Sequence, residues 1–600
     1  MTDANPPKVQ LRRKSTMGQA VEKPRDTRGT LRRLLDYFAR AKRLLVALLA
    51  AVLAVTVTSL LTPALQGAVI DAIQARAWDR FGLLLGCLLA AFGGNVAVTL
   101  AQGLLSARLS QNIVRRMRYD LFRKIDNLPI AYLDRHSNGD VMSRMTNDIE
   151  NISNTVSQSL GSLVSGLLTV AGTIAIMFWY CWQLTLITLV TVALTVLVTK
   201  GMSRRMRTAY RQRADALGRL DGHAQEMISG YRTILAYNRQ DAVRAEFAEI
   251  SDTLTREGIR AEVLGGSMGP LMNAISSLGF VIVAAFGGYF ALRGLITIGV
   301  ISAFILYAKQ FSRPLNEIAQ LFGSVETALA GAERVFVLMD QPDEDNAGTE
   351  TPDHVTGNVS FRHVNFSYLP GKQVLYDFNL EVHAGQKIAL VGATGSGKTT
   401  VVNLLMRFYP VDSGEILIDG QDIRTLRRDW LRHNTAIVLQ DTVLFSDTIE
   451  HNIKYADPGA DDARMIRAAE MSNCAPFIDR LPQTYHTFLK QAGAGLSQGQ
   501  RQLLNIARAL LADPRILILD EATSSVDTRT EQNIQDALVR LMKNRTSLII
   551  AHRLSTIQDA DVIVVMDKGR VVETGNHEEL LQKRGAYYAL YMAQFAGQKT

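Results

Sequence analysis

Six long stretches of mostly apolar residues in the first half of the chain limit what it can fold into more than any other feature. A helix needs about 20 apolar residues to cross the hydrocarbon core of a bilayer, and each stretch meets or approaches that length. The stretches are approximately residues 44–70, 81–107, 158–181, 183–200, 266–291 and 296–322. The sequence therefore predicts an α-helical transmembrane domain with six helices over residues 44–337.

The connections between these stretches differ in length and in charge. The segments 108–157 and 201–265 are long and carry clustered arginines, whereas the other connections are short and carry few charges. Cytoplasmic loops of membrane proteins are enriched in Lys and Arg. We therefore expect a multi-pass protein of the cell membrane, with both long segments, both termini and the basic extension 1–43 in the cytoplasm.

Two parts of the long segments interrupt the helical pattern. Residues 132–148 contain the break Ser137-Asn138-Gly139-Asp140, and residues 229–240 contain Gly230 followed by a short mixed run. Each part is typical of a turn plus a short helix that crosses between two long helices, and a simple loop at a helix tip fits equally well. Long cytoplasmic extensions of this kind indicate contact with a cytoplasmic domain.

Charge and cysteine content narrow the class of protein. The formal net charge of +8 and the basic extension fit either a nucleic acid or a membrane surface as partner. The adjoining apolar run favours the lipid bilayer, so we expect no nucleic-acid partner. The three cysteines, Cys87, Cys181 and Cys474, show no paired spacing, which argues against a disulfide framework or a zinc site.

The character of the sequence changes near residue 338. Residues 338–357 are rich in Asp, Glu, Pro, Gly and Thr, which is typical of a linker. In the remainder, residues 358–600, strand patterns alternate with helical patterns, which predicts an α/β domain.

This second domain contains the most specific motif of the chain, GATGSGKT at residues 392–399. It fits the phosphate-loop pattern in full, because an apolar strand precedes it and a helical run follows it. Backbone N–H groups of such a loop wrap phosphate oxygens at a helix N-terminus. We expect Lys398 to reach the β- and γ-phosphates of ATP and Thr399 to ligate Mg²⁺. The predicted nucleotide-binding residues here are Gly392, Thr394, Gly395, Ser396, Gly397, Lys398, Thr399 and Thr400.

A second apolar strand, residues 516–519, ends in Asp520 and Glu521. Four apolar residues in a row suit a strand that is buried on both faces. Alone, the acidic pair would fit an ordinary solvated strand end equally well. With the phosphate loop upstream, we expect Asp520 to hold Mg²⁺ and Glu521 to polarise the water that attacks the γ-phosphate.

The segment Leu496-Ser497-Gln498-Gly499-Gln500 resembles the signature motif of the ABC family, with Gln498 where the commonest form has glycine. The layout of residues 30–595 resembles an ABC exporter half-transporter, which implies an ATP-binding cassette of the phosphate-loop α/β class. In this family two cassettes pair head to tail, and each ATP lies between one phosphate loop and the other subunit's signature. The resemblance implies ATP-binding roles for Ser497, Gly499 and Gln500.

Further cassette positions match the family in their order along the chain. The resemblance implies that Tyr368 stacks on adenine and that Gln440 takes part in hydrolysis and holds Mg²⁺. It also implies that Asp527, in a segment that resembles the D-loop, contacts the nucleotide and that His552 is the catalytic histidine that contacts the γ-phosphate.

More narrowly, the chain resembles the catalytically intact subunit of bacterial heterodimeric multidrug exporters. One departure bears on this reading. Exporters usually carry Thr-x-Val-Gly-Glu-x-Gly before the signature, but here Lys490 stands at a glycine position and Gln491 at the glutamate position. We interpret this as a signature that serves a partner's impaired site, so we expect the partner to be a different half-transporter chain.

Polar residues on one face of the sixth apolar run leave two interpretations open. They are Lys309, Gln310, Arg313, Asn316 and Gln320. They would line a substrate cavity that accepts anionic groups, or they would snorkel to the cytoplasmic interface. Asn95, Gln102 and Asn273 would either line the cavity or form hydrogen bonds between helices, and Asp71 would belong to an outer gate or begin a solvated loop.

Taken together, the sequence predicts ATP-driven export of amphipathic small molecules, drugs or lipids, by alternating access. A lipid, peptide or metallophore transporter on the same fold is an alternative. A second alternative, from another class, is a protein in which ATP gates a sensor or regulator without transport.

Overall fold

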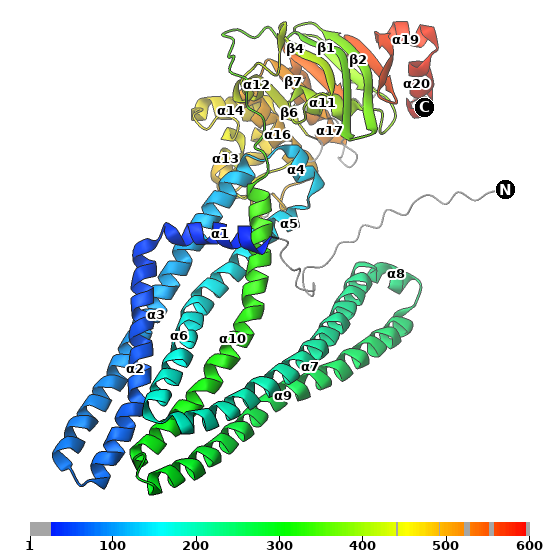
Figure 1. Ribbon diagram of the computed structural model, residues 1–600. Coiled ribbons are helices and arrows are strands. Elements are labelled where there is room, and N and C mark those ends of the chain that lie inside the picture. The colour runs from blue at the N-terminus through cyan, green and yellow to red at the C-terminus, as the bar shows by residue number, and fades with distance from the viewer. Residues whose placement is uncertain (1–25, 440–441, 491–492, 521–527, 551–556, 596–600) are drawn as a thin grey trace. The chain divides into compact units, whose positions relative to one another are not determined.

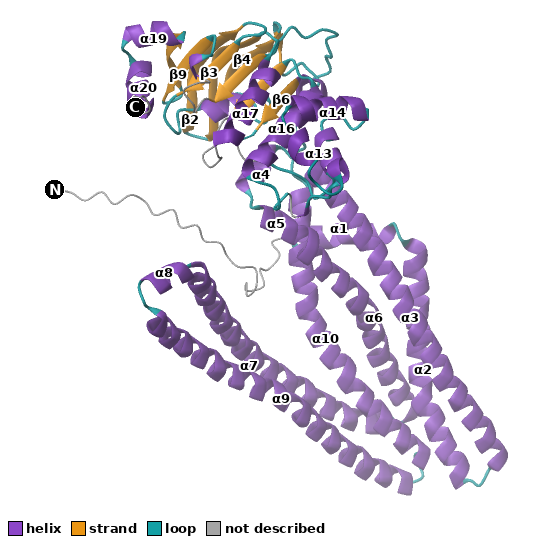
Figure 2. Cartoon of the chain, turned by 180° about the vertical axis from the view of Figure 1, so that it is seen from behind, coloured by secondary structure: helices purple, strands orange, loops and turns teal. Residues whose placement is uncertain are grey.

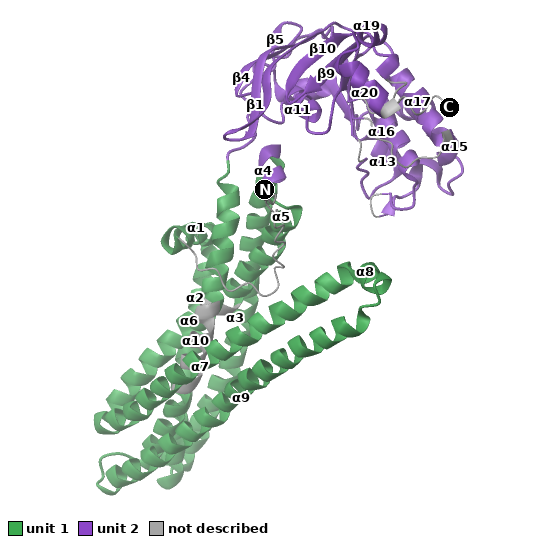
Figure 3. Cartoon of the chain, turned by 90° about the vertical axis from the view of Figure 1, so that its right-hand side faces the viewer, with its two compact units in different colours: residues 1–127, 136–341 green, residues 128–135, 342–600 purple. Residues whose placement is uncertain are grey.

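The computed structural model describes residues 26–439, 442–490, 493–520, 528–550 and 557–595. It divides into two compact units, which Figure 3 shows in different colours. Unit 1 contains Met1–Asn127 and His136–Gln341, and unit 2 contains Leu128–Arg135 and Pro342–Thr600. The described part of unit 1 is helical, whereas unit 2 combines strands with helices (Figure 2).

Unit 1 is built mainly from long helices (Figure 1). They are α1 Thr27–Ala39, α2 Lys42–Gln74, α3 Trp78–Asp126, α5 Asn138–Ser143, the π-helical turn η1 Arg144–Asp148, α6 Ile149–Tyr180, α7 Trp182–Ser229, α8 Tyr231–Ala236, α9 Gln240–Leu292 and α10 Ile298–Met339.

Five helical segments of unit 1 are long and apolar enough to cross a membrane, as far as the structure describes the chain. They are Lys42–Gln74, Trp78–Asp126, Asn138–Tyr180, Trp182–Ser229 and Gln240–Leu292. The sixth predicted run lies in α10, where the described apolar stretch is Ile298–Gln310. The predicted fold class, a helical transmembrane domain plus an α/β cassette, is confirmed.

Three helices are much longer than a membrane requires. Helices α3, α7 and α9 have 49, 48 and 53 residues. At about 1.5 Å per residue, each is more than twice as long as the roughly 30 Å hydrocarbon core. The surplus length forms the predicted cytoplasmic extensions, because it coincides with the arginine-rich segments of the sequence.

The connections on the outer side are as short as the sequence predicts. Only Cys181, in an extended conformation, separates α6 from α7. Between α9 and α10, Gly294 adopts a φ of +71°, a left-handed conformation that suits glycine. Both predicted cytoplasmic crossings contain a short helix, since α4 (Ile130–Arg135) and α5 follow α3, and α8 follows Gly230.

The long helices pair as antiparallel neighbours. Helix α2 packs against α3, α10 packs against α6 and α2, and α7 and α9 form a long hairpin with α8 at its tip (Figure 1).

Among the polar residues considered above, Asn95 forms hydrogen bonds between helices, since its Nδ2 donates to Thr58 Oγ1 at 2.8 Å and to Ser59 Oγ at 3.1 Å.

Asp71 on α2 caps the first turn of α10. Its carboxylate accepts hydrogen bonds from Gly299 N at 2.8 Å and from Thr297 Oγ1 at 2.6 Å. The backbones of α2 and α10 come very close here, because a Cβ built on Gly67 would lie 2.6 Å from Gly299 O. Asp71 therefore joins two membrane helices instead of starting a solvated loop.

Helix α1 packs against the C-terminal end of α10. Arg33 Nη1 lies 2.6 Å from Asp340 Oδ2, and its guanidinium lies 4.2 Å from the ring centre of Phe336. Tyr37 stacks on the same ring and donates a hydrogen bond to Asp120 Oδ2 at 2.9 Å. Burial, together with the neighbouring carboxylate, raises the pKa of Tyr37 to about 12.

An ion pair between the buried Asp148 and the partly exposed Arg334 joins η1 to α10. The side chain of Asp148 is 6% exposed and accepts two hydrogen bonds from Arg334, one of them from Nε at 2.9 Å. A glycine on α10 makes room for this carboxylate, since a Cβ on Gly331 would lie 3.3 Å from Asp148 Oδ1.

The variant Asp148→Asn should lower the stability of unit 1. It removes the Asp148 charge that faces the Arg334 guanidinium, at an expected cost of about 2 kcal/mol because Arg334 is partly solvated. Tryptophan-fluorescence melting in detergent should show an apparent midpoint several degrees lower. The control Glu262→Gln breaks the exposed pair with Arg213 and should change little; equal shifts in both variants would contradict the prediction.

Unit 2 contains two sheets. The strands are β1 Val359–Leu369, β2 Lys372–Val382, β3 Lys387–Val391, β4 Ser413–Ile418, β5 Gln421–Asp422, β6 Thr435–Val438, β7 Ile516–Asp520, β8 Thr546–Ile550, β9 Val562–Asp567 and β10 Arg570–Gly575. The smaller, antiparallel sheet has the order β2-β1-β4-β5, and the larger has the order β10-β9-β3-β8-β7-β6. In the larger sheet β3, β6, β7, β8 and β9 are parallel, and β10 pairs antiparallel with β9.

Unit 2 also contains helices, some of which pack against the larger sheet (Figure 2). They are α11 Lys398–Leu405, α12 Arg428–Asn434, α13 Ile449–Lys454, α14 Asp462–Met471, α15 Ala475–Ile478, the 3₁₀ turn η2 Thr484–His486, α16 Gln498–Ala512, α17 Thr528–Met542, α19 His577–Lys583 and α20 Ala586–Phe595. Alternate residues of each central strand enter two separate cores, as Ile518 and Leu519 do. Burial on both faces explains why the strand sequences are continuously apolar.

Most of the predicted linker is attached to unit 2. Glu344 forms ion pairs with Arg428 and Arg432 at 2.6 and 2.5 Å, and Trp430 Nε1 donates to Pro352 O at 3.1 Å. Near its end, Asp419 accepts hydrogen bonds from the backbone N–H groups of residues 356–358. The boundary between the units falls at Gln341–Pro342, so the chain from Pro342 onward belongs to unit 2.

Candidate functional site

The phosphate loop begins where β3 ends, and two of its glycines are needed for its path. Gly392 has a φ of +153°, and a Cβ there would lie 2.2 Å from Met566 O on the neighbouring strand. Gly397 has a φ of +103° and caps α11, where a Cβ would lie 2.8 Å from Leu375 Cδ2. The loop therefore depends on glycine both for backbone conformation and for close packing.

Lys398, the first residue of α11, folds back over this loop. Its side chain is buried, and Nζ donates to Gly392 O at 2.8 Å and Ala393 O at 3.1 Å. Burial lowers the pKa of Lys398, and the negative charge of Asp520 acts in the opposite direction. A buried ammonium held by neutral carbonyls can exchange them for phosphate oxygens, which compensate its charge better.

Other atoms of the loop also suit a phosphate group. Ser396 is 3% exposed, and its buried Oγ has no hydrogen-bond partner among the residues that the structure describes. Thr394, Gly395 and Thr399 are exposed on the surface of the loop. An unpaired buried hydroxyl is costly, so the loop fits a ligand that supplies acceptor oxygens here.

The sheet topology brings Asp520 to the same edge as the phosphate loop. The carboxyl ends of β3, β6, β7 and β8 meet there because these strands are parallel. Asp520 ends β7 and is close enough to Lys398 to influence its pKa. Gln440, Glu521, Asp527 and His552 lie outside the described residues, although Gln440, Glu521 and His552 closely follow β6, β7 and β8 in the sequence.

The signature segment forms the start of α16. Ser497 is exposed at the N-cap, and its Oγ accepts a hydrogen bond from Gln500 N at 3.2 Å. In return, Gln500 Oε1 accepts one from Ser497 N at 2.9 Å, which completes a capping box. Gly499 is buried. The capping box fixes the exposed Ser497 hydroxyl at a helix N-terminus, an arrangement that suits an anion. Gln491 lies outside the described residues.

Tyr368 is tied to the phosphate-loop helix as well as to neighbouring rings. Its OH donates to Thr400 Oγ1 at 3.2 Å and accepts from Asn403 Nδ2 at 3.2 Å. Its ring stands edge-on to those of Phe366 and Tyr409, at centroid distances of 4.8 and 4.9 Å. Thr400, predicted from the sequence as a nucleotide ligand, thus also positions the predicted adenine platform.

The structure adds residues that the sequence did not single out. Helix α4 belongs to unit 2, where Ile130 packs against the core. Asp134 accepts a hydrogen bond from Tyr409 OH, and Arg135 Nη2 donates to Tyr368 O at 2.9 Å. Burial and the Asp134 carboxylate raise the pKa of Tyr409. One short helix between two membrane helices therefore contacts the predicted adenine platform.

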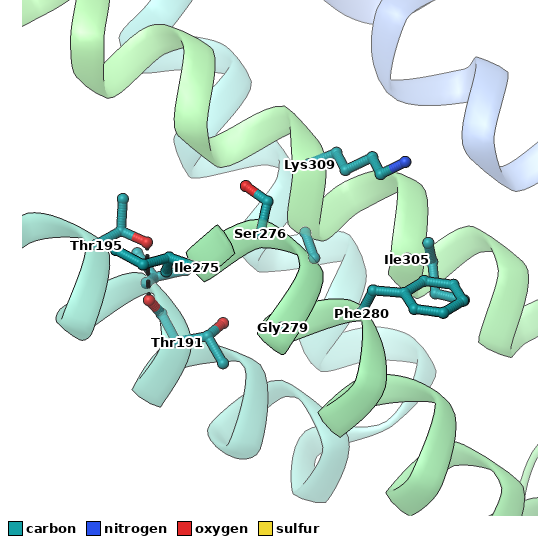
Figure 4. A pocket seen from close by; sticks show the side chains of 10 residues that line it. Thr191, Thr195, Ile275, Ser276, Gly279, Phe280, Ile305 and Lys309 are labelled. Carbon is teal, nitrogen blue, oxygen red and sulfur yellow. Dashed lines mark hydrogen bonds between the residues drawn. The ribbon is translucent and has the colours of Figure 1, made fainter. Parts of the chain in front are cut away.

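Polar side chains inside the membrane helices surround a small pocket (Figure 4). Thr191 and Thr195 of α7, Ser276 of α9 and Lys309 of α10 line it with apolar residues. Figure 4 shows the Lys309 ammonium directed away from the two threonines, so the Lys309 stem lines the pocket and its charge does not enter it. The side chains of Arg313, Asn316 and Gln320 lie outside the described part of the chain.

Comparison with known proteins assigns each of the two units to a protein family. Residues 44–315 match the ABC transporter transmembrane region family, and residues 375–524 match the ABC transporter family. An uncharacterized ABC transporter ATP-binding protein of Bacillus subtilis is 45% identical over 96% of this chain and 95% of its own length. The chain belongs to the ABC transporter family.

Other relatives of this ABC transporter have more specific names. A fatty acid ABC transporter ATP-binding/permease protein of Mycobacterium bovis is 44% identical over 80% of this chain and 76% of that protein. An ATP-dependent lipid A-core flippase of Syntrophus aciditrophicus is 36% identical over 96% of this chain and 97% of that protein. A bacterial Atm1-family ABC exporter, solved with ATP bound, superposes with a TM-score of 0.75 at 29% identity, covering 93% of this chain and 99% of that one.

These findings establish what kind of transporter this is. One chain carries a transmembrane domain and an ATPase cassette, so it is an ABC exporter half-transporter. Its cassette hydrolyses ATP, and that hydrolysis is coupled to transport. It is a multi-pass protein of the cell membrane with the cassette in the cytoplasm.

Proposed function

We propose that this chain is one half of an exporter that moves amphipathic small molecules, drugs or lipids, across the cell membrane by alternating access. The observation that carries the proposal is the phosphate loop, where buried Lys398 donates to two carbonyls and Ser396 Oγ has no partner within the described part of the chain. These atoms are ready to accept phosphate oxygens. Nucleotide binding would therefore change the contacts of the loop without rebuilding it.

Each residue at the sheet edge has a proposed role in hydrolysis. Lys398 binds the β- and γ-phosphates, and Ser396 with the loop N–H groups completes the cradle. Thr399, Asp520 and Gln440 would hold Mg²⁺, which neutralises charge on the phosphates when bound. Glu521 orients the attacking water and His552 contacts the γ-phosphate, while Tyr368 positions the adenine.

The half-site in this chain requires a second cassette. In the proposed arrangement Ser497, Gly499 and Gln500 contact nucleotide bound to the partner, and Asp527 lies near the shared interface. Gln491 and Lys490, at positions where exporters usually have Glu and Gly, favour a partner of different sequence. The α7–α8–α9 hairpin supports pairing, because its tip extends away from α2, α3, α6 and α10 in unit 1 (Figures 1 and 2).

The names of the relatives favour lipids among the amphipathic substrates. Two of them are named as a fatty acid transporter and a lipid A-core flippase. Both names describe molecules with an acyl portion and a polar group. The polar residues within otherwise apolar helices, such as Thr191, Ser276 and Lys309, fit a path for molecules of this mixed character.

The first test is ATP hydrolysis by this chain purified alone in lipid nanodiscs, beside Glu521→Gln. We expect the chain alone to bind ATP and to hydrolyse it at no more than about the rate of the variant, because its site lacks the partner's signature. Activity at least about 100-fold above that of Glu521→Gln would instead indicate a homodimer with two working sites. ATP-dependent flux into sealed vesicles, measured with a co-expressed partner, then tests transport.

A further inference from the structure

An open, positively charged hollow lies where α1, α2 and α3 meet. It has a volume of about 640 Å³, which is in the size range of ligand sites. The residues that line it are Ala39, Arg40, Ala41, Lys42, Arg43, Leu44, Asn112 and Arg116. Four of these eight are cations, and none of the described lining residues is acidic.

The cations of this hollow differ from their neighbours in lacking carboxylate partners. Nearby, Arg33 is paired with Asp340, and Arg118 is paired with Glu150. Within the part of the chain that the structure describes, Arg40, Lys42, Arg43 and Arg116 form no ion pair; Arg116 Nη1 donates only to Arg40 O, at 3.5 Å. Four cations around one hollow repel one another, so a bound anion would stabilise this arrangement.

From its neighbours in the sequence, we expect the hollow to lie at the level of the lipid headgroups on the cytoplasmic side. Lys42 and Arg43 come immediately before the first apolar run, and Asn112 and Arg116 come shortly after the second. Helix α1 lies across the end of α2 instead of continuing it (Figure 1). The arrangement combines a basic pocket with a position at the membrane boundary, where phospholipid headgroups supply anions.

Apolar side chains beside the hollow suit the acyl chains of the same ligand. Leu35 on α1 is 55% exposed, and Val46 on α2 is 65% exposed. In the sequence they flank three of the cations, Arg40, Lys42 and Arg43. A free phosphate ion would use the charges only, whereas a phospholipid would use the charges and the exposed apolar surface.

We propose that this hollow is a binding site for an anionic phospholipid, held by its phosphate between Arg40, Lys42, Arg43 and Arg116. The site belongs to unit 1, whereas the phosphate loop belongs to unit 2. Because α1 also holds the cytoplasmic end of α10 through Arg33 and Tyr37, the lipid would brace the helix that leads into the cassette.

The test uses the full chain in phosphatidylcholine nanodiscs that contain a photoreactive phosphatidylglycerol, without nucleotide. Arg43→Gln/Arg116→Gln should lower phosphatidylglycerol affinity about 25-fold, at about fivefold for each charge removed near the surface. Arg43→Lys/Arg116→Lys keeps the charges and should retain binding, which separates loss of charge from misfolding. The control Arg204→Gln/Arg205→Gln removes two exposed arginines of α7 outside the hollow and should have little effect.

Three outcomes would overturn the proposal. They are equal loss of lipid in the control pair, unchanged affinity in the Gln pair, and displacement of the lipid by millimolar inorganic phosphate alone. Mapping of the photoadduct to α1–α3 is the supporting result. The measurement needs no ATP hydrolysis, so failure of the proposed transport function would leave it intact.

Discussion

Replacing Lys398 by methionine is expected to lower ATP hydrolysis by at least about 100-fold, as loss of one buried donor to a transferring group typically does. The ammonium is buried and rests on two backbone carbonyls of the loop it serves. Methionine has a similar length and fits the apolar part of the space, but it cannot donate to phosphate oxygens. The rate should be measured in the assembly that hydrolyses ATP in the test of pairing, with ATP binding followed separately.

The matched control for this prediction is Lys372→Met. Lys372 is an exposed lysine at the start of β2 in the same unit, so its loss removes the same charge from the cassette. The control should keep its activity within about twofold, because exposed charges contribute little to a distant site. Equal activity in the two variants would show that Lys398 does not bind the transferred phosphate.

The variant Tyr409→Phe should uncouple the membrane helices from the cassette. It keeps the ring that packs on Tyr368 and removes the OH that donates to Asp134 on α4. Hydrogen bonds to charged groups contribute about 1.5–3 kcal/mol, so docking of α4 should weaken about 10- to 100-fold. We expect transport per ATP hydrolysed to fall about tenfold or more, while basal hydrolysis stays within a few fold of that of the unmodified chain.

Two comparisons make this prediction specific. Tyr376→Phe removes the OH that donates to Gln373 O at 3.2 Å in the same unit and should leave coupling unchanged. The double variant Asp134→Asn/Tyr409→Phe should be no worse than Tyr409→Phe alone, because both changes remove one shared contact. Additive losses would mean that Asp134 and Tyr409 act independently.

The sequence predicts those structural features of this transporter that depend on residues close together in the chain. Lipid allows only helices or closed barrels, so the apolar runs determine helices such as α2 and α7. The phosphate loop is equally local, since Gly392, Gly397 and Lys398 carry its geometry within eight residues of one another. Asp520 could be placed beside this loop because parallel strands bring their carboxyl ends to one edge.

The contacts that the sequence did not predict join residues that are far apart in the chain. Asp134 and Tyr409 are 275 positions apart, and the sequence around either residue does not indicate a contact with the other residue. From the sequence alone, Asp71 was expected in an outer gate or at the start of a loop. Its role as a cap of α10 can be seen only when the fold brings Gly299 next to it. The basic hollow was hidden for the same reason, since Arg116 joins Lys42 and Arg43 only when α3 packs beside α2.

The single residue between α6 and α7 has a mechanical consequence. With only Cys181 between them, α7 cannot slide far along α6, and its main freedom is rotation about this point. Its 48 residues form an arm about 70 Å long, so a rotation of about 10° carries the far end through roughly 12 Å. A small rotation of α7 near the outer surface therefore becomes a large displacement of α8. We expect the hairpin to turn about Cys181 as a rigid arm.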